Sequence, residues 1–99
     1  MKRYFSHYTY IYPDIYLKSH IVEMDNDGKI IRWFPFEREI EKTEFYNGVV
    51  VFVPEGEVFD KEVMIPVMIK SDFLSSVTLP NLSNISYNVI NIDDFCLKP

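Results

Sequence analysis

Alternating side chains in the first quarter of the chain predict two strands. Residues 4–12 read YFSHYTYIY, so an extended chain places tyrosines on one side and Phe5, His7 and Ile11 on the other. Aromatic and β-branched residues in a period of two favour strands. Pro13 and Asp14 interrupt the pattern, which resumes over residues 16–24. We expect two strands joined at Pro13.

The segment DNDG at residues 25–28 predicts the next turn. Asn26 and Asp27 suit a type I turn, and Gly28 suits the left-handed bulge position that completes a three-residue hairpin loop. Residues 29–34 then form the return strand, which Pro35 ends.

A second hairpin is expected at Asn47 and Gly48, which lie between residues 43–46 and the apolar run 49–53. The valine-rich run has no polar side, so this strand is expected to be buried on both faces. The preceding stretch EREIEK, residues 37–42, fits either a helical turn or a strand.

The last third of the chain predicts two more strands. Residues 54–57 form a loop, and residues 63–69 form a strand that Pro66 interrupts and so confines to an edge or a bulge. Residues 70–86 resemble a loop with one short helix capped by Ser71, and residues 87–92 form a closing strand. The whole chain, residues 1–99, is therefore expected to be a single, mainly β domain: a small antiparallel barrel or sandwich built from a β-meander, with at most one short helix.

Composition and charge limit the classes of partner and the cellular compartment that we expect for this chain. A net charge of −5 offers no broad attraction to nucleic acid or to an anionic membrane. The chain has no apolar run long enough to span a bilayer and no apolar core of a signal peptide at its start, so we expect a cytoplasmic protein. The single cysteine, Cys96, cannot form an internal disulfide and fits a small buried apolar residue better than a nucleophile.

Candidate metal and catalytic motifs are incomplete. Glu23, Asp25 and Asp27 precede a glycine as in a calcium loop, but the acid required at the twelfth position falls on Phe34. His7 and His20 have no partner at zinc spacing, and no phosphate-binding or nucleophile motif occurs. Acidic side chains that one loop could gather around a hard cation are more typical of a solvated surface. These acidic residues are Glu55, Glu57, Asp60 and Glu62. We therefore expect no catalytic residue, metal or cofactor.

Tyrosines supply the candidate binding surface. A tyrosine ring offers flat apolar area with a hydroxyl group, and such rings are enriched in binding patches, although they also simply cover sheets. The candidate residues are Tyr4, Tyr8, Tyr10, Tyr12 and Tyr16.

The middle of the chain resembles the small β domain that precedes the barrel in metal-dependent amidohydrolases of the cytosine deaminase and dihydroorotase type. The resembling residues are HIVE at 20–23, DGKII at 27–31, GVVV at 48–51 and VP at 53–54. The resemblance implies an accessory β domain standing alone. The chain departs from the family after Asp60, which is followed by Lys61 and Glu62 with no histidine, so the metal-binding pair is missing and no catalytic residue carries over.

These observations favour a non-catalytic module that binds a protein partner or itself, with a homodimer as the simplest form. One alternative is a small-molecule-binding barrel in which His7, His20, Arg32 or Glu23 orients a polar ligand. The other is an accessory subunit of an amidohydrolase-like enzyme.

Overall fold

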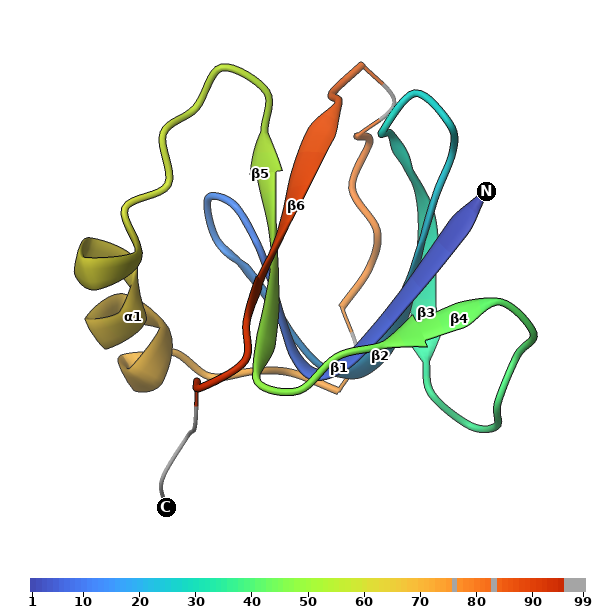
Figure 1. Cartoon of the computed structure of the whole chain (residues 1–99), viewed down its shortest axis with the longest axis horizontal. Coiled ribbons are helices and arrows are strands. Elements are labelled where there is room, and N and C mark those ends of the chain that lie inside the picture. The colour runs from blue at the N-terminus through green and yellow to red at the C-terminus, as the bar shows by residue number, and fades with distance from the viewer. Residues whose placement is uncertain (76, 83, 96–99) are drawn as a thin grey trace.

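One six-stranded sheet and one helix make up the fold (Figure 1). The computed structural model describes residues 1–75, 77–82 and 84–95. The strands lie in the order β3-β2-β1-β5-β6, with β4 also beside β1. The expected mainly β class with one short helix is confirmed. The elements are β1 (Lys2–Ile11), β2 (Ile15–Met24), β3 (Ile30–Pro35), β4 (Thr43–Phe45), β5 (Val49–Pro54), α1 (Lys61–Lys70) and β6 (Tyr87–Ile92).

The sheet is mixed and open, not an antiparallel meander closed into a barrel. The β1–β2, β2–β3 and β5–β6 pairs are antiparallel, but β4 and β5 both run parallel to β1. Parallel neighbours need a crossover rather than a tight turn. Here residues 36–42 carry the chain from β3, at one edge of the sheet, to the far side of β1.

The predicted hairpin at residues 25–28 is confirmed. The carboxylate Oδ1 of Asp25 accepts hydrogen bonds from the backbone N–H groups of Asp27 and Lys29, both at 2.9 Å. Gly28 has a φ of +79°, the left-handed conformation expected at that position.

The predicted hairpin at Asn47 and Gly48 is wrong, because β4 and β5 continue in one direction along β1. Phe5 pairs with Phe45 and Tyr8 with Val49, so two residues of β1 face three residues of the other strand. Gly48 supplies positive φ, +73°, to this bulge instead of to a turn.

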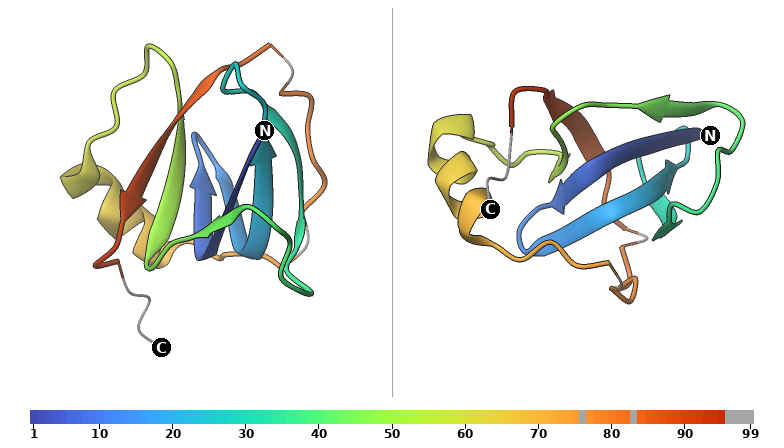
Figure 2. Two further views of the ribbon diagram at one scale, coloured as in Figure 1. Left: turned by 45° about the vertical axis from the view of Figure 1, so that its right-hand side comes forward. Right: turned by 90° about the horizontal axis from the view of Figure 1, so that it is seen from below.

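Side-chain alternation shifts by one residue where the bulge crosses the sheet. In β2, Leu17 and Val22 face the same core although one is odd and the other even, and Ser19 between them has a φ of +56°. On β1, the Ser6 hydroxyl donates to the Gly48 carbonyl (2.7 Å) and accepts from the Tyr8 N–H. The sheet bends at this line (Figure 2).

The bend divides the sheet into two arms. We call the first half of β1, the second half of β2, β3 and β4 the N-terminal arm, and the other half of each long strand, with β5 and β6, the C-terminal arm. The inner core lies between the arms, and Val77, Leu82 and Ile85 pack against it from the irregular segment before β6. Its buried residues are Tyr4, Ile11, Leu17, Val22, Met24, Ile30, Trp33, Val50, Phe52 and Tyr87.

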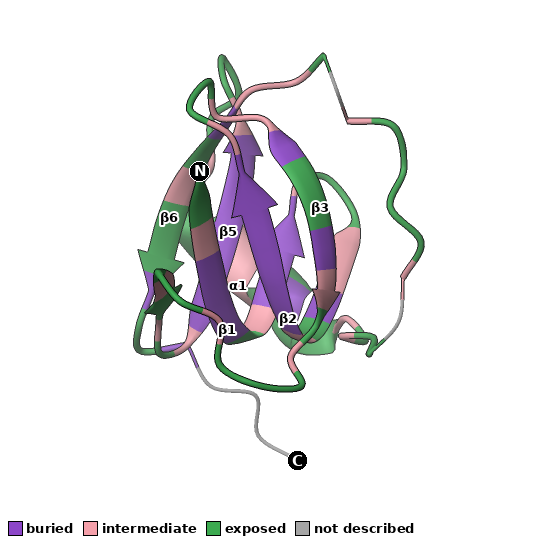
Figure 3. Ribbon diagram, turned by 90° about the vertical axis from the view of Figure 1, so that its right-hand side faces the viewer, coloured by how far each residue is buried: buried purple, intermediate pink, exposed green. Residues whose placement is uncertain are grey.

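The outer core lies between the C-terminal arm and α1. Figure 3 shows β2 and β5 buried along most of their length, which confirms that the valine-rich strand is buried on both faces. The buried residues of the outer core are Tyr10, Val49, Val51, Val53, Met68, Ile92 and Phe95.

The expected strand at residues 63–69 is wrong, because α1 occupies this segment. Asp60 caps the helix by accepting from the Glu62 N–H at 3.0 Å, Glu62 lies in the first turn and Lys70 in the last. Ser71 ends this helix instead of starting another, its hydroxyl donating to the Val67 carbonyl. Residues 37–42 are neither helix nor strand.

Candidate functional site

The five candidate tyrosines do not gather on one exposed face. Tyr4 lies in the inner core, whereas Tyr10 is fully buried in the outer core, with its hydroxyl donating to the Pro13 carbonyl at 2.7 Å. Tyr8, Tyr12 and Tyr16 are half-buried against the same outer core. The shifted alternation explains the division, since residues 4 and 10 would share a face in a regular strand.

The outer side of the N-terminal arm carries two rows of side chains across the strands. We call this surface the open face, because α1 covers only the other arm. The register places the rows Thr43–Arg3–Glu23–Arg32 and Phe45–Phe5–Ile21–Phe34 side by side.

Glu23 forms the centre of the polar row. Its side chain is only 2% exposed and is held between two guanidinium groups, with Arg3 Nε 2.5 Å from Oε2 and Arg32 Nε bound to Oε1. The hydrogen bond from Arg32 is the largest of the effects that lower the pKa of Glu23, and Arg3 adds to it. The carboxylate is therefore ionised at neutral pH and fully engaged, which does not suit a general base or a metal ligand.

The aromatic row ends in an exposed ring. Phe5 is nearly buried and meets Phe36 edge-on, with ring centroids 4.6 Å apart. Phe45 packs against Phe5 at 5.5 Å but leaves 51% of its surface exposed. His7 lies beside Phe5 at 5.5 Å and is also exposed. The cluster thus offers apolar area to a partner at its rim.

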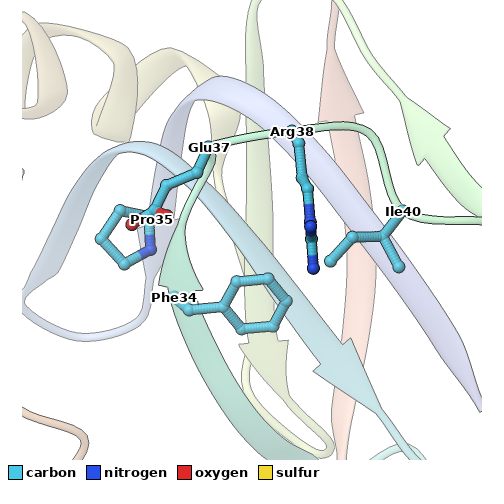
Figure 4. Close-up of a pocket in the computed structure, with 5 residues that line it drawn as sticks. All are labelled: Phe34, Pro35, Glu37, Arg38 and Ile40. Carbon is cyan, nitrogen blue, oxygen red and sulfur yellow. The ribbon is translucent and has the colours of Figure 1, made fainter.

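The loop of residues 36–42 borders this face and forms a shallow pocket of about 240 Å³. Figure 4 shows the Arg38 side chain reaching between the ring of Phe34 and Ile40, while Glu37 turns toward Pro35. Within residues 1–75, 77–82 and 84–95, no side chain forms an ion pair or hydrogen bond with the Arg38 guanidinium. The loop presents its charges unpaired.

Buried polar groups elsewhere are structural. Ser6 lies opposite His20 in the β1–β2 register, but its hydroxyl donates to Gly48, and His20 Nδ1 contacts the Lys18 carbonyl at 2.8 Å. Both residues are buried away from any pocket described for the chain. This pair lacks the hydroxyl–imidazole hydrogen bond that activates a nucleophile.

The other candidates from the sequence do not form a site either. The described part of the chain holds no group of three His, Cys, Asp or Glu residues able to bind a metal. The Asp25 carboxylate accepts a hydrogen bond within its own turn, and the Asp60 carboxylate caps α1. Cys96 lies outside the described residues.

Sequence reasoning missed the open face because its rows depend on strand register. The only local sign of this face in the sequence is the alternation of charges in residues 37–42, which border it. No helix among the described residues is long and apolar enough to cross a membrane. Comparison of the chain with known protein families, curated proteins and solved structures gives no match, so the resemblance to amidohydrolases stays a prediction.

Proposed function

We propose that this chain is a self-associating interaction module, which forms a two-fold symmetric homodimer through its open face. The observation that carries the proposal is the order of charges in the exposed loop 37–42. A two-fold interface brings the same patch of both copies together, so that patch must complement itself.

The loop sequence EREIEK complements itself when two copies meet antiparallel. Glu37 then faces Lys42 of the second copy, and Arg38 faces Glu41, each contact occurring twice. None of these four side chains forms an ion pair within its own chain among the described residues. Opposite charges in register set the orientation of two partners more than they add affinity.

Apolar contacts must supply most of the affinity. Exposed ion pairs contribute roughly 0.2–1 kcal/mol each, whereas burying a phenylalanine side chain contributes about 1.5–3 kcal/mol. Phe45, half-exposed beside the loop, would bury its free area in both copies of the dimer. The aromatic cluster therefore drives association, and the loop sets the register.

Sedimentation equilibrium of the purified chain tests the proposal. We expect a mass above 11.8 kDa that approaches twice this value with rising concentration. Arg38→Glu places two like-charged pairs in the interface and should weaken the dimer about tenfold. The double variant Arg38→Glu with Glu41→Arg restores both pairs and should recover most of the affinity.

A matched pair of apolar variants locates the interface. Phe45→Ser should favour the monomer, while Val63→Ser, at a similarly exposed position on α1, should leave the association unchanged. The proposal would be overturned if the chain stays monomeric at all concentrations up to roughly 1 mM, which is about the weakest affinity of a specific interaction. Equal loss from the Phe45 and Val63 variants, or no recovery by the double variant, would overturn it as well.

A further inference from the structure

Helix α1 carries more apolar surface than the sheet covers. Residues 63–69 are all apolar. Those that pack against the outer core are Met64, Ile65 and Met68. Val63, Val67 and Ile69 keep 60%, 44% and 49% of their surface exposed. A helix at a free surface normally carries charged and polar residues on its outer side, whereas a helix that is apolar on every side is buried on both.

The exposed side chains form a ridge along the helix. Residues three and four positions apart lie on the same side of a helix, so the ridge runs through Val63, Pro66, Val67 and Lys70. It is about 15 Å long, and Figure 1 shows the helix at the outside of the molecule. Pro66 has no N–H group, so the Glu62 carbonyl lacks the donor that a helix normally supplies. The ridge therefore offers apolar area with a hydrogen-bond acceptor beside it.

Acidic side chains flank this ridge. Residues 55–72 contain five acids and two lysines. The acids are Glu55, Glu57, Asp60, Glu62 and Asp72. Among the residues that the structure describes, none of them forms an ion pair. Four of the five lie in or before the first turn of α1, where Lys61 is the one base. The N-terminal end of the ridge is therefore strongly acidic.

This charge decides between the occupants that an apolar ridge could have. A second copy of the chain would bring five more acids to the same contact. An anionic lipid surface or a nucleic acid would be repelled. A basic protein segment compensates the acids and can also donate to the Glu62 carbonyl. Apolar area beside uncompensated acids therefore fits a partner that is itself apolar and basic.

We propose that the outer ridge of α1 binds an amphipathic helix of another protein. This helix lies antiparallel to α1, with apolar side chains over Val63 and Val67 and with lysine or arginine in its last turn. The antiparallel orientation brings the basic turn to the acidic end of α1, and basic residues are also favourable at a helix C-terminus. The contact lies on the C-terminal arm and does not depend on the proposed dimer.

Fluorescence anisotropy with a labelled synthetic helix tests the proposal. The probe has about 15 residues, the length at which isolated helices become stable, with leucines in one stripe and lysines in its last turn. A second peptide has glutamates in place of the lysines. The chain is kept at a concentration where it is monomeric, so failure of the dimer would not affect the result. We expect saturable binding of the lysine peptide and about tenfold weaker binding of the glutamate peptide.

Variants of the chain connect the binding to the ridge. Val63→Ser should lower the affinity for the lysine peptide about fivefold, the loss expected for the exposed part of a valine. Ile31→Ser, at an exposed apolar residue of β3, is the matched control and should leave it unchanged. Glu62→Lys should weaken binding of the lysine peptide and strengthen binding of the glutamate peptide, which loss of folding could not do. Asp27→Lys makes the same charge change in the β2–β3 turn and should keep the order of the two peptides.

Several outcomes would overturn the proposal. They are no saturable binding of the lysine peptide up to roughly 1 mM, equal binding of the two peptides, and equal effects of the Val63 and Ile31 variants. Binding of the chain to neutral phosphatidylcholine vesicles, if Val63→Ser abolished it, would assign the ridge to a lipid surface instead. Loss of self-association in the Val63 variant would assign it to a second copy.

Discussion

The outer faces of the two arms of the sheet are covered in different ways. The C-terminal arm presents Tyr10 and the valines of β5 to α1, whose Met68 is fully buried in the contact. The N-terminal arm is covered by two of its own arginines over Glu23 and by the ring of Phe36, from the loop after β3, over Phe5. It ends in a half-exposed Phe45.

The difference follows from which side chains the bend turns outward. In the C-terminal arm, the outward even positions of β1 and β2 carry Tyr8, Tyr10 and Tyr16 besides the exposed Lys18, and tyrosine rings bury large areas against a helix. Before the bend, the odd positions carry arginine and glutamate as well as phenylalanine. A charged row cannot be covered by an apolar helix without a large desolvation cost. The open face is therefore the side of this sheet that carries a charged row and that the helix does not cover.

Breaking the bend itself should have the largest effect. A Cβ atom at Gly48 would lie 2.0 Å from the Ile92 carbonyl oxygen and 2.9 Å from Asp93 Cα, both backbone atoms that cannot move alone. Positive φ adds strain for any other residue. We expect Gly48→Ala to lower the free energy of unfolding by more than about 3 kcal/mol in urea titrations.

Gly56 is the control for the conformational part of that loss. It also has positive φ, +89°, but a Cβ atom there would meet nothing within 4 Å. Gly56→Ala should cost only about 1 kcal/mol. Equal costs at the two glycines would mean that the close approach of the Ile92 and Asp93 backbone adds nothing to the conformational cost at Gly48.

Truncating one side chain on each outer face compares the two arms directly. Met68→Ala leaves a cavity beneath α1 and should cost about 3 kcal/mol. Phe45→Ser removes a ring that is half in solvent and should cost the monomer less than about 1 kcal/mol. Urea titrations at a concentration where the chain is monomeric measure both. The reverse order would mean that the open face, not the helix, stabilises the fold.

Local signals allowed part of this architecture to be predicted. The turn at residues 25–28 has its own hydrogen-bonding side chain and glycine, and residues 87–92 alternate, so both were predicted correctly. Residues 63–69 were predicted to form a strand in spite of Pro66, although Asp60, Glu62 and Lys70 are the cap and charge signals of a helix.

Features that depend on distant strands could not be predicted in this way. Positive φ at Gly48 suits a hairpin or a bulge, and only β1 and β6 decide between them. The tyrosine face assumed unbroken alternation along β1, which shifts by one residue at the bulge between Phe5 and Tyr8. The ion pairs of Glu23 with Arg3 and Arg32 form because strand register places these three residues side by side.

Acid should affect the open face before the helix-covered face. The lowered pKa of Glu23, whose ordinary value is 4.5, means that its stabilising effect is complete above that pH and is lost as the pH falls through the folded-state pKa. Glu23→Gln should therefore cost about 2 kcal/mol at pH 7 and progressively less below pH 4.5. Glu57→Gln, at an exposed acid, is the control. Hydrogen exchange at decreasing pH should show β3 losing protection as the pH falls below 4.5, and this pH-dependent loss should disappear in the Glu23 variant, because the ionised Glu23 side chain pairs with Arg32 of β3.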